Sequence, residues 1–141
     1  MRDSLTMRKS TDRFSFILKP STVAGAGVGV FALHDIAKDT FLELFLENFE
    51  EELVAEGAVP KELQGFCIPQ KDGKLLCPKL FNRLDIGNYL NHSKNNNARL
   101  ENEKGYFAKR DIKAGEEMFA DYREVDSQLG ELGEGEPYYE S

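Results

Sequence analysis

Two short stretches of this chain repeat one another, and the repeat limits what the chain can fold into. Residues 29–36, GVFALHDI, return as residues 105–112, GYFAKRDI, and five of the eight positions are identical. Each copy places aromatic and β-branched residues before an Asp-Ile pair, which is typical of a strand followed by a turn. Eight residues are too few to indicate a duplicated domain or a solenoid. The repeat therefore predicts a β-rich fold that uses one strand–turn–strand arrangement twice.

Most of the remaining chain also divides into short apolar runs separated by turn residues. Runs rich in aromatic and β-branched residues predict strands at 14–18, 30–33, 40–45 and 117–122. Two hairpins are predicted as well. One spans 66–77 around Asp72-Gly73, a strong hairpin signal, and the other spans 99–108.

Helix signals are weak by comparison. The acidic run 47–56 has a thin apolar stripe that allows a short helix, and 81–90 has room for one or two helical turns. The asparagines at 95–97 predict a turn. Residues 1–13 are polar and predict an N-terminal arm, while 123–141 are acidic, dotted with glycine, and predict a mobile tail.

Length and charge bound the class of protein. A chain of 141 residues is long enough for one domain with its own core. The net charge of −7 argues against a nucleic-acid partner, because phosphate binding needs a basic stripe. The same charge favours a basic partner, although a modest negative charge also serves to keep a protein in solution.

Cysteine usage and hydropathy exclude several further classes. Cys67 and Cys77 are ten residues apart, whereas zinc sites need closely spaced pairs and usually four ligands. No metal site is therefore predicted, and two thiols in a reducing compartment are expected. No run approaches the about 18 apolar residues of a membrane-spanning helix. The polar N-terminus has no cleavable secretion signal, which favours a cytoplasmic or nuclear location.

Three motifs are ambiguous when each is taken alone. The glycines between Gly25 and Gly29 lack the spacing of a dinucleotide fingerprint, so they indicate either a plain turn or a loop that approaches a ligand closely. In Asn91-His92-Ser93 the histidine and serine are adjacent and cannot face one another in a strand, so a capped turn is the simple reading. Tyr122 is either a core residue or a hydroxyl held at a reacting centre.

In combination and in this order, the motifs resemble the SET-domain family of protein lysine methyltransferases. They read Gly27-x-Gly29-Val30-Phe31-Ala32, then Asn91-His92-Ser93 with Asn97 four residues later, then Asp111-Ile112-x-x-Gly115-Glu116-Glu117-x-x-x-Asp121-Tyr122. The resemblance implies a mainly β fold of several small curved sheets with few short helices. In this fold the Asn-His-Ser segment is threaded through a loop as a pseudoknot. The implied domain spans 14–123, between an arm at 1–13 and an acidic tail at 124–141.

The family's site residues transfer to matching positions here. The implied cofactor is S-adenosyl-L-methionine, and the lysine would enter by a narrow channel from the opposite side. The glycine loop would contact the cofactor through its backbone, the Asn-His pair would hold its amino-acid and adenine portions, and a tyrosine would pack beside it. These cofactor-binding residues are Gly27, Val28, Gly29, Tyr89, Asn91 and His92.

The resemblance also implies the residues of the substrate channel. Tyr122 matches the family's catalytic tyrosine at the channel floor. Ala120 stands where the family often has a tyrosine or phenylalanine that limits the number of methyl groups added. Alanine leaves more room, so we expect dimethylation or trimethylation, unless another aromatic side chain fills the gap.

Some positions depart from the family's pattern. Lys94 stands where many members have cysteine, Asn96 where proline is usual, and Asn88 where arginine is common. The cysteine-rich zinc segment that often follows the domain is missing, so the tail, through Tyr138 or Tyr139, is expected to close the cofactor or peptide channel.

The resemblance therefore implies an enzyme. Its reaction would be transfer of methyl groups to the side-chain amine of lysine in a basic protein, such as a histone or a ribosomal protein. The alternative is a catalytically silent SET-like module that binds a protein partner. No residue indicates the oligomeric state, so a homodimer that completes the substrate site stays open.

Overall fold

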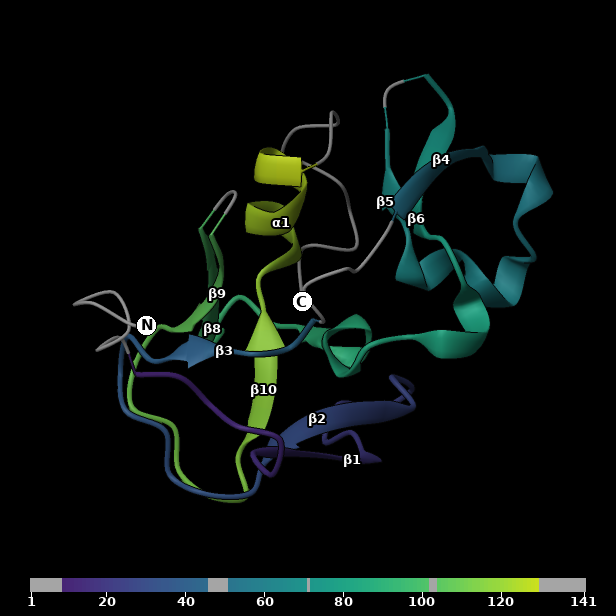
Figure 1. Cartoon of the computed structure of the whole chain (residues 1–141). Coiled ribbons are helices and arrows are strands. Elements are labelled where there is room, and N and C mark those ends of the chain that lie inside the picture. Colours follow the sequence, from purple (N-terminus) through teal and green to yellow (C-terminus); the bar gives the residue numbers. More distant parts are fainter. Residues whose placement is uncertain (1–8, 46–50, 71, 102–103, 130–141) are drawn as a thin grey trace.

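A computed structural model of the chain describes residues 9–45, 51–70, 72–101 and 104–129 (Figure 1). Its central sheet has the strand order β1-β2-β10-β7. The four strands are β1 (Phe16–Pro20), β2 (Val28–Ala32), β10 (Glu117–Ala120) and β7 (Asn91–His92). β10 lies between β2, to which it is antiparallel, and β7, to which it is parallel. The segment expected to form a pseudoknot thus lies directly beside the last strand.

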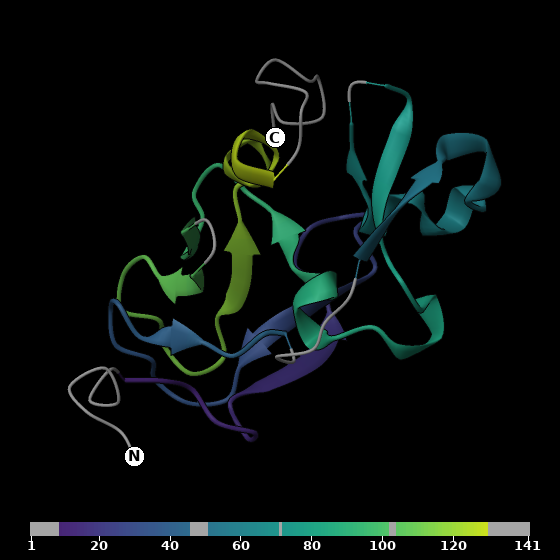
Figure 2. The same cartoon turned by 45° about the horizontal axis from the view of Figure 1, so that its top comes forward.

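Two further three-stranded sheets complete the β structure of the described residues. One has the order β3-β9-β8, and the other has the order β4-β6-β5. Their strands are β3 (Phe41–Leu42), β8 (Ala98–Glu101), β9 (Gly105–Ala108), β4 (Glu51–Ala55), β5 (Ile68–Pro69) and β6 (Lys74–Pro78). In both Figure 1 and Figure 2 the β4–β6 sheet lies to one side of β10, apart from the other two sheets.

The helices are short. Among the described residues four are 3₁₀ turns, namely η2 (Glu56–Ala58), η3 (Lys61–Phe66), η4 (Phe81–Arg83) and η5 (Ile86–Tyr89). The α-helix α1 (Tyr122–Leu129) follows β10 after a single residue and lies beyond its end (Figure 1). No helix among the described residues is long and apolar enough to cross a membrane.

The core of the described residues consists of two clusters. The larger cluster joins the first two sheets and includes Val30, Leu42 and Met118, all almost fully buried. A smaller cluster around Leu75 and Cys77 lies under the β4–β6 sheet.

The two copies of the repeat contact each other directly. Ile36 and Ile112, which end the two copies, form an antiparallel bridge in which each N–H donates to the other's carbonyl at 2.8 Å. Both side chains are buried in the larger core cluster. The predicted strand–turn–strand arrangement is therefore used twice, and the two copies are joined by the bridge between Ile36 and Ile112.

The aspartates of the repeat make reciprocal contacts. Asp35 Oδ1 accepts a hydrogen bond from Ala114 N at 2.9 Å, and Asp111 Oδ1 accepts one from Lys38 N at 2.8 Å. Ala114 and Lys38 each stand three residues after the aspartate of their own copy. Each aspartate thus satisfies a backbone donor in the turn that follows the other copy.

Several sequence predictions are confirmed and others are wrong. The mainly β class with small sheets, both hairpins and the helical turns within 81–90 are confirmed. The acidic run is wrong as a helix, because Glu51–Ala55 is strand β4, paired along its length with β6. In the predicted strand 40–45, only Phe41–Leu42 pairs as a strand.

The predicted end of the last strand is also corrected. β10 ends at Ala120, and the chain from Tyr122 to Leu129 is helix α1 rather than the start of a mobile tail. Val125 packs against the core, and Glu124 Oε1 accepts a hydrogen bond from Leu100 N at 2.9 Å. These contacts stabilise a helix that the acidic sequence does not predict.

Candidate functional site

The pairing of β7 with β10 brings the second and third motifs together. Asn91 lies opposite Phe119, and His92 lies opposite Ala120. Ser93 N extends the contact by donating to Ala120 O at 3.0 Å. The sequence-predicted residues at 91, 92, 120 and 122 therefore occupy one small region.

His92 and Tyr122 are in contact there. Tyr122 N donates to His92 Nδ1 at 2.9 Å, which makes Nδ1 an acceptor and assigns the ring proton to Nε2 in the neutral tautomer. The two ring centroids are 5.2 Å apart. Asp121 lies beside the histidine, and its pKa is held below the usual range chiefly by hydrogen bonds from Arg123. The histidine is thus fixed in orientation by the backbone of the predicted catalytic tyrosine.

Tyr122 lines a large cavity, and its hydroxyl is held by a hydrogen bond. It donates to the carbonyl oxygen of Leu90 at 2.7 Å. Leu90, Ala120 and Tyr122 all line the cavity, whose volume is about 930 Å³. Tyr106 lines it too, and burial raises the pKa of its hydroxyl, with a smaller contribution from Tyr122 nearby. Both tyrosines therefore present polar groups at an otherwise largely apolar wall.

The opposite wall of the cavity comes from the separate β4–β6 unit. The cavity residues in this unit and the 3₁₀ turns beside it are Glu51, Glu56, Gln64, Gly65, Phe66, Cys67, Ile68, Pro69 and Leu75. The cavity thus lies between the β4–β6 unit on one side and β10 with α1 on the other. Ala120 and Tyr122, the two predicted channel residues, are part of its lining.

Most of the predicted cofactor residues lie in or next to β2 and β7, the two strands that flank β10, and none of them lines the cavity. Gly25 and Gly27 have positive φ angles and form the turn before β2, which ends with Ser21 N donating to Gly27 O at 2.8 Å. Val28 is 42% exposed. Asn91 Nδ2 donates to the carbonyl oxygen of Val28 at 3.0 Å. The glycine loop and the Asn-His pair are therefore adjacent, as the resemblance implies.

Tyr89 is the remaining predicted cofactor residue. It ends the 3₁₀ turn η5, packs partly buried against the core, and meets the edge of the Phe66 ring at a centroid distance of 5.5 Å. The turn η5 also packs against β2, the strand that contains Val28 and Gly29.

Glu117 is a site residue that sequence reasoning missed. Its carboxylate is buried beneath β2, and it accepts hydrogen bonds from Ser21 Oγ at 2.8 Å, from Thr22 N at 2.8 Å and from Thr22 Oγ1 at 2.6 Å. Asn91 Nδ2 donates to it as well, at 3.2 Å. In the motif, Glu117 looks like one of two adjacent surface glutamates, because nothing local distinguishes it from Glu116.

Asn97 was also underestimated. It is almost fully buried, its Nδ2 donates to Glu117 O at 2.9 Å, and its Oδ1 accepts from Phe119 N at 2.8 Å. A side-chain amide thus takes the place of a neighbouring strand along β10. A turn was expected at 95–97, but a buried asparagine of this kind has no local signal.

The cysteines and the acidic residues add no metal site in the part of the chain that is described. Cys67 and Cys77 are both free thiols, and burial raises the pKa of each. No group of three or more His, Cys, Asp or Glu side chains lies close enough to hold a metal ion among those residues.

Comparisons with known proteins agree with this arrangement. The family model for the SET domain matches residues 27–123. Among solved structures, a candidate histone methyltransferase of Plasmodium falciparum is similar, with 22% sequence identity and a TM-score of 0.54. The alignment covers 77% of this chain and 93% of that one. No curated protein sequence matches the chain significantly.

The chain belongs to the SET-domain family, since the family model covers more than half of it and contains all three motifs. The likeness to the Plasmodium structure supports the same fold. The family is one of protein lysine methyltransferases. An enzyme of this class needs a site for a lysine side chain and a site for a methyl donor, and the cavity and the Asn-His pair are the candidates for these two sites.

Proposed function

We propose that this protein transfers methyl groups from S-adenosyl-L-methionine to the side-chain amine of lysine in a basic protein. The observation that carries the proposal is the position of the Tyr122 hydroxyl. Tyr122 lines the cavity, its hydroxyl is hydrogen-bonded to Leu90 O at 2.7 Å, and the backbone of the same residue holds His92. Tyr122 thus contacts both the cavity and the Asn-His pair.

The amine must be neutral before it can accept a methyl group. Free lysine has a pKa of about 10.4, so removing its proton at pH 7 costs about 4.6 kcal/mol. A cavity lined by Leu90, Ala120 and aromatic rings disfavours the charged form by desolvation. The Tyr122 hydroxyl donates its proton to Leu90 O, and a hydroxyl oxygen can also accept a hydrogen bond, here from the amine of a bound lysine. These groups orient the amine's lone pair without acting as a base.

The residues present fit the cofactor. Asn91 uses its Nδ2 on Val28 O and Glu117, which leaves its Oδ1 as an acceptor for an ammonium group. Gly29 leaves room for the backbone of β2 to lie close to these side chains. When bound, the cofactor supplies a sulfonium methyl group that is already a strong electrophile. The protein's part is alignment of the amine with that group.

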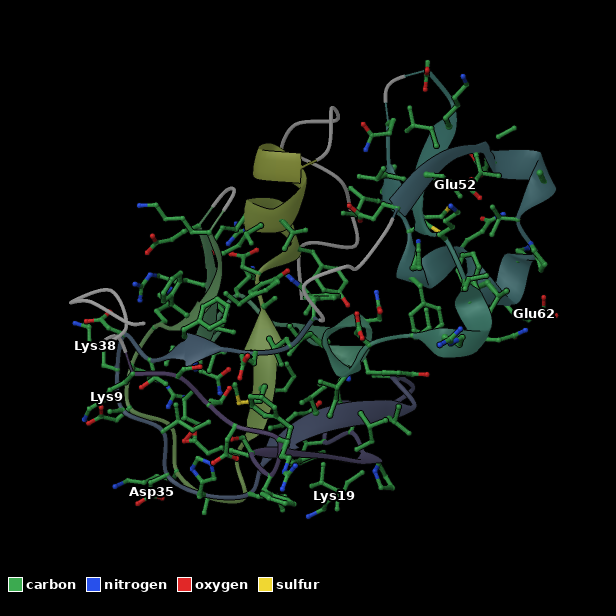
Figure 3. The ribbon with its side chains drawn as sticks, viewed as in Figure 1. Lys9, Lys19, Asp35, Lys38, Glu52 and Glu62 are labelled. Atoms are coloured by element: carbon green, nitrogen blue, oxygen red, sulfur yellow. The ribbon has the colours of Figure 1, made fainter. Side chains whose placement is uncertain are left out.

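Charge supports a basic substrate. Glu51 and Glu56 line the cavity on the β4–β6 side. Figure 3 shows Glu52 and Glu62 at the surface of the same unit, while Lys9, Lys19 and Lys38 lie on the far part of the molecule. The carboxylates of Glu51 and Glu56 would attract a lysine-rich segment and disfavour an acidic one. Histones are one class of such substrate, and ribosomal proteins are another.

The test separates cofactor binding from chemistry. S-adenosylmethionine and S-adenosylhomocysteine are titrated calorimetrically into the wild type and into Tyr122→Phe, and methyl transfer to mixed histones and ribosomal proteins is measured for both. We expect both proteins to bind, and turnover by the variant to fall by about 10² or more, because an orienting hydroxyl is lost at the reacting centre.

Two outcomes would contradict the proposal. If the wild type bound neither ligand, S-adenosyl-L-methionine would not be its cofactor. Equal turnover by the wild type and Tyr122→Phe would show that the Tyr122 hydroxyl does not orient the amine.

A further inference from the structure

Gly29 is required by the space around it rather than by its backbone conformation. Its φ is not in the positive region, yet an added Cβ would lie 2.8 Å from Cδ of Glu117 and would overlap Oε2 of the same carboxylate. It would also lie 3.2 Å from Asn91 Nδ2. The second glycine of the motif thus makes room for a carboxylate that arrives from β10.

That carboxylate is buried with neutral partners. Glu117 is 6% exposed, and its hydrogen-bond donors are the Ser21 hydroxyl, the backbone and hydroxyl of Thr22, and the Asn91 amide. None of the ion pairs among the described residues includes it. Burial opposes its ionisation, but these hydrogen bonds together hold its pKa below the usual value. A buried negative charge therefore lies under the Asn-His pair without a cation beside it.

The same carboxylate decides which way the Asn91 amide faces. Asn91 Nδ2 donates to Val28 O at 3.0 Å and to Glu117 Oε2 at 3.2 Å, so both of its N–H groups are used. Rotating the amide by half a turn would place its oxygen against a carbonyl and a carboxylate, which is repulsive. The amide oxygen must lie on the side away from both, and no described residue donates to it.

We propose that Glu117 is a positioning residue for the methyl donor. It holds Asn91 with the amide oxygen outward and places a negative charge behind it, so that this end of the site selects a ligand with an ammonium group. The inference rests on the proposed function. It adds a buried recognition element for the amino-acid end of the cofactor and gives a reason for glycine at position 29.

The experiment compares two ligands that differ in the amino-acid end. S-adenosylhomocysteine carries the ammonium group, and 5′-methylthioadenosine lacks the whole amino-acid portion. Both are titrated calorimetrically into the wild type, Glu117→Gln and the control Glu116→Gln, whose glutamate pairs with Arg110 near the surface. We expect Glu117→Gln to weaken S-adenosylhomocysteine binding by about tenfold or more while methylthioadenosine binding changes less than about twofold. Glu116→Gln should change neither.

Each other outcome is informative. Equal weakening of both ligands would mean that Glu117 supports β2 only, and no weakening of either would mean that it has no role in binding. Either result overturns this inference and leaves the proposed function intact. If the wild type binds neither ligand, both the role of Glu117 and the proposed function are refuted.

A variant that fails to fold does not end the test. Glu117→Asp keeps the charge but draws the carboxylate back from Asn91, so the same preference for S-adenosylhomocysteine should fall. An unchanged preference in this folded variant would overturn the inference.

Discussion

Tyr122 is tied to the segment around His92 through both its backbone and its hydroxyl. The backbone N–H is bound by His92 Nδ1, and the hydroxyl is bound to Leu90 O. Since residues 90–92 run beside β10, a shift of the Asn-His pair would move the tyrosine as well. A change at the Asn-His pair is therefore expected to alter the geometry of the cavity around Tyr122.

The size of residue 120 should set how many methyl groups are added. Ala120 lines the cavity next to Tyr122 and is almost fully buried. In Ala120→Phe the larger ring would occupy the space that a methylated amine needs. We expect the wild type to form dimethyl or trimethyl product, and the variant to slow every step after the first by about tenfold or more.

Mass spectrometry of product after exhaustive reaction checks this expectation. Ala120→Gly is the control and should keep the wild-type product distribution. A wild type that stops at monomethyl-lysine would show that another side chain, such as Tyr106, already fills the gap.

The buried carboxylate should also affect stability against acid. Hydrogen bonds lower the pKa of Glu117 in the folded protein relative to its ordinary value near 4.5, although burial opposes them. A group with a lowered folded pKa stabilises the fold at pH values above its unfolded pKa. That stability is lost as the pH falls through the folded pKa.

Urea unfolding between pH 3 and pH 7 measures the effect, with the pH limits chosen to bracket about 4.5. Glu117→Gln should be less stable than the wild type at pH 7, and the difference should shrink as the pH falls below 4.5. A difference that stays constant with pH would mean that the charge of Glu117 is unimportant for stability.

Among the secondary-structure elements, the two repeats form one reciprocal unit. Asp39 and Gly115 occupy equivalent positions after the two Asp-Ile pairs, and both have positive φ, 70° and 91°. The N–H of each donates at 2.8 Å to an alanine carbonyl, Asp39 to Ala108 and Gly115 to Ala32. Glycine adopts this conformation readily, and aspartate tolerates it better than most other residues.

The reciprocal aspartates predict equal effects of mutation. Asp35→Ala and Asp111→Ala each remove the acceptor for one backbone donor in the turn of the other repeat. We expect each to lower the free energy of unfolding by about 1 kcal/mol. Asp72→Ala is a matched control, because Asp72 Oδ1 accepts only from Lys74 N within its own hairpin turn.

Chemical denaturation of the three variants tests this pairing. The two repeat variants should each show a loss, and the double variant should lose at least the sum. A large loss in one repeat variant and none in the other would contradict the reciprocal arrangement.

For the molecule as a whole, the net charge of −7 should assist the binding of a basic substrate. Attraction between exposed charges is screened over about 10 Å at 0.1 M salt. We expect kcat/KM for a lysine-rich peptide to fall several-fold when the salt concentration rises from about 0.05 to about 0.5 M. The change should appear mainly in KM.

A second peptide isolates the electrostatic contribution. It keeps the reacting lysine but has alanine in place of the flanking basic residues, so its kcat/KM should depend little on salt. Equal salt dependence for the two peptides would locate the effect in the enzyme rather than in substrate attraction.

Much of the fold could be predicted from local sequence patterns. The hairpin at 66–77 was predicted from Asp72-Gly73, and the hairpin at 99–108 from the runs 99–103 and 105–108, because such signals act over a few residues. The repeat predicted two similar strand–turn units for the same reason. The motifs indicated the family, and the model of that family matches residues 27–123, which contain Gly27, Asn91 and Tyr122.

Local patterns were misleading where distant pairing outweighed them. Glu51–Ala55 is acidic enough to resemble a helix, but it pairs with β6 as a strand. Tyr122–Leu129 was assigned to the tail because of its acidic residues, although Tyr122, Val125 and Leu129 have the spacing of one helix face, and Val125 and Glu124 contact the core and β8. Such contacts join residues far apart in the chain, and propensity carries no information about them.

The same distinction applies to the site. Residue types and their order are sufficient to indicate the family, and they make the residues at 27–29, 91, 92, 120 and 122 the candidates for its site. The roles of Glu117 and Asn97 became apparent only when β10 was placed between β2 and β7. A carboxylate or an amide reads as an ordinary surface residue until its burial and its partners are known, and both come from segments brought together by folding.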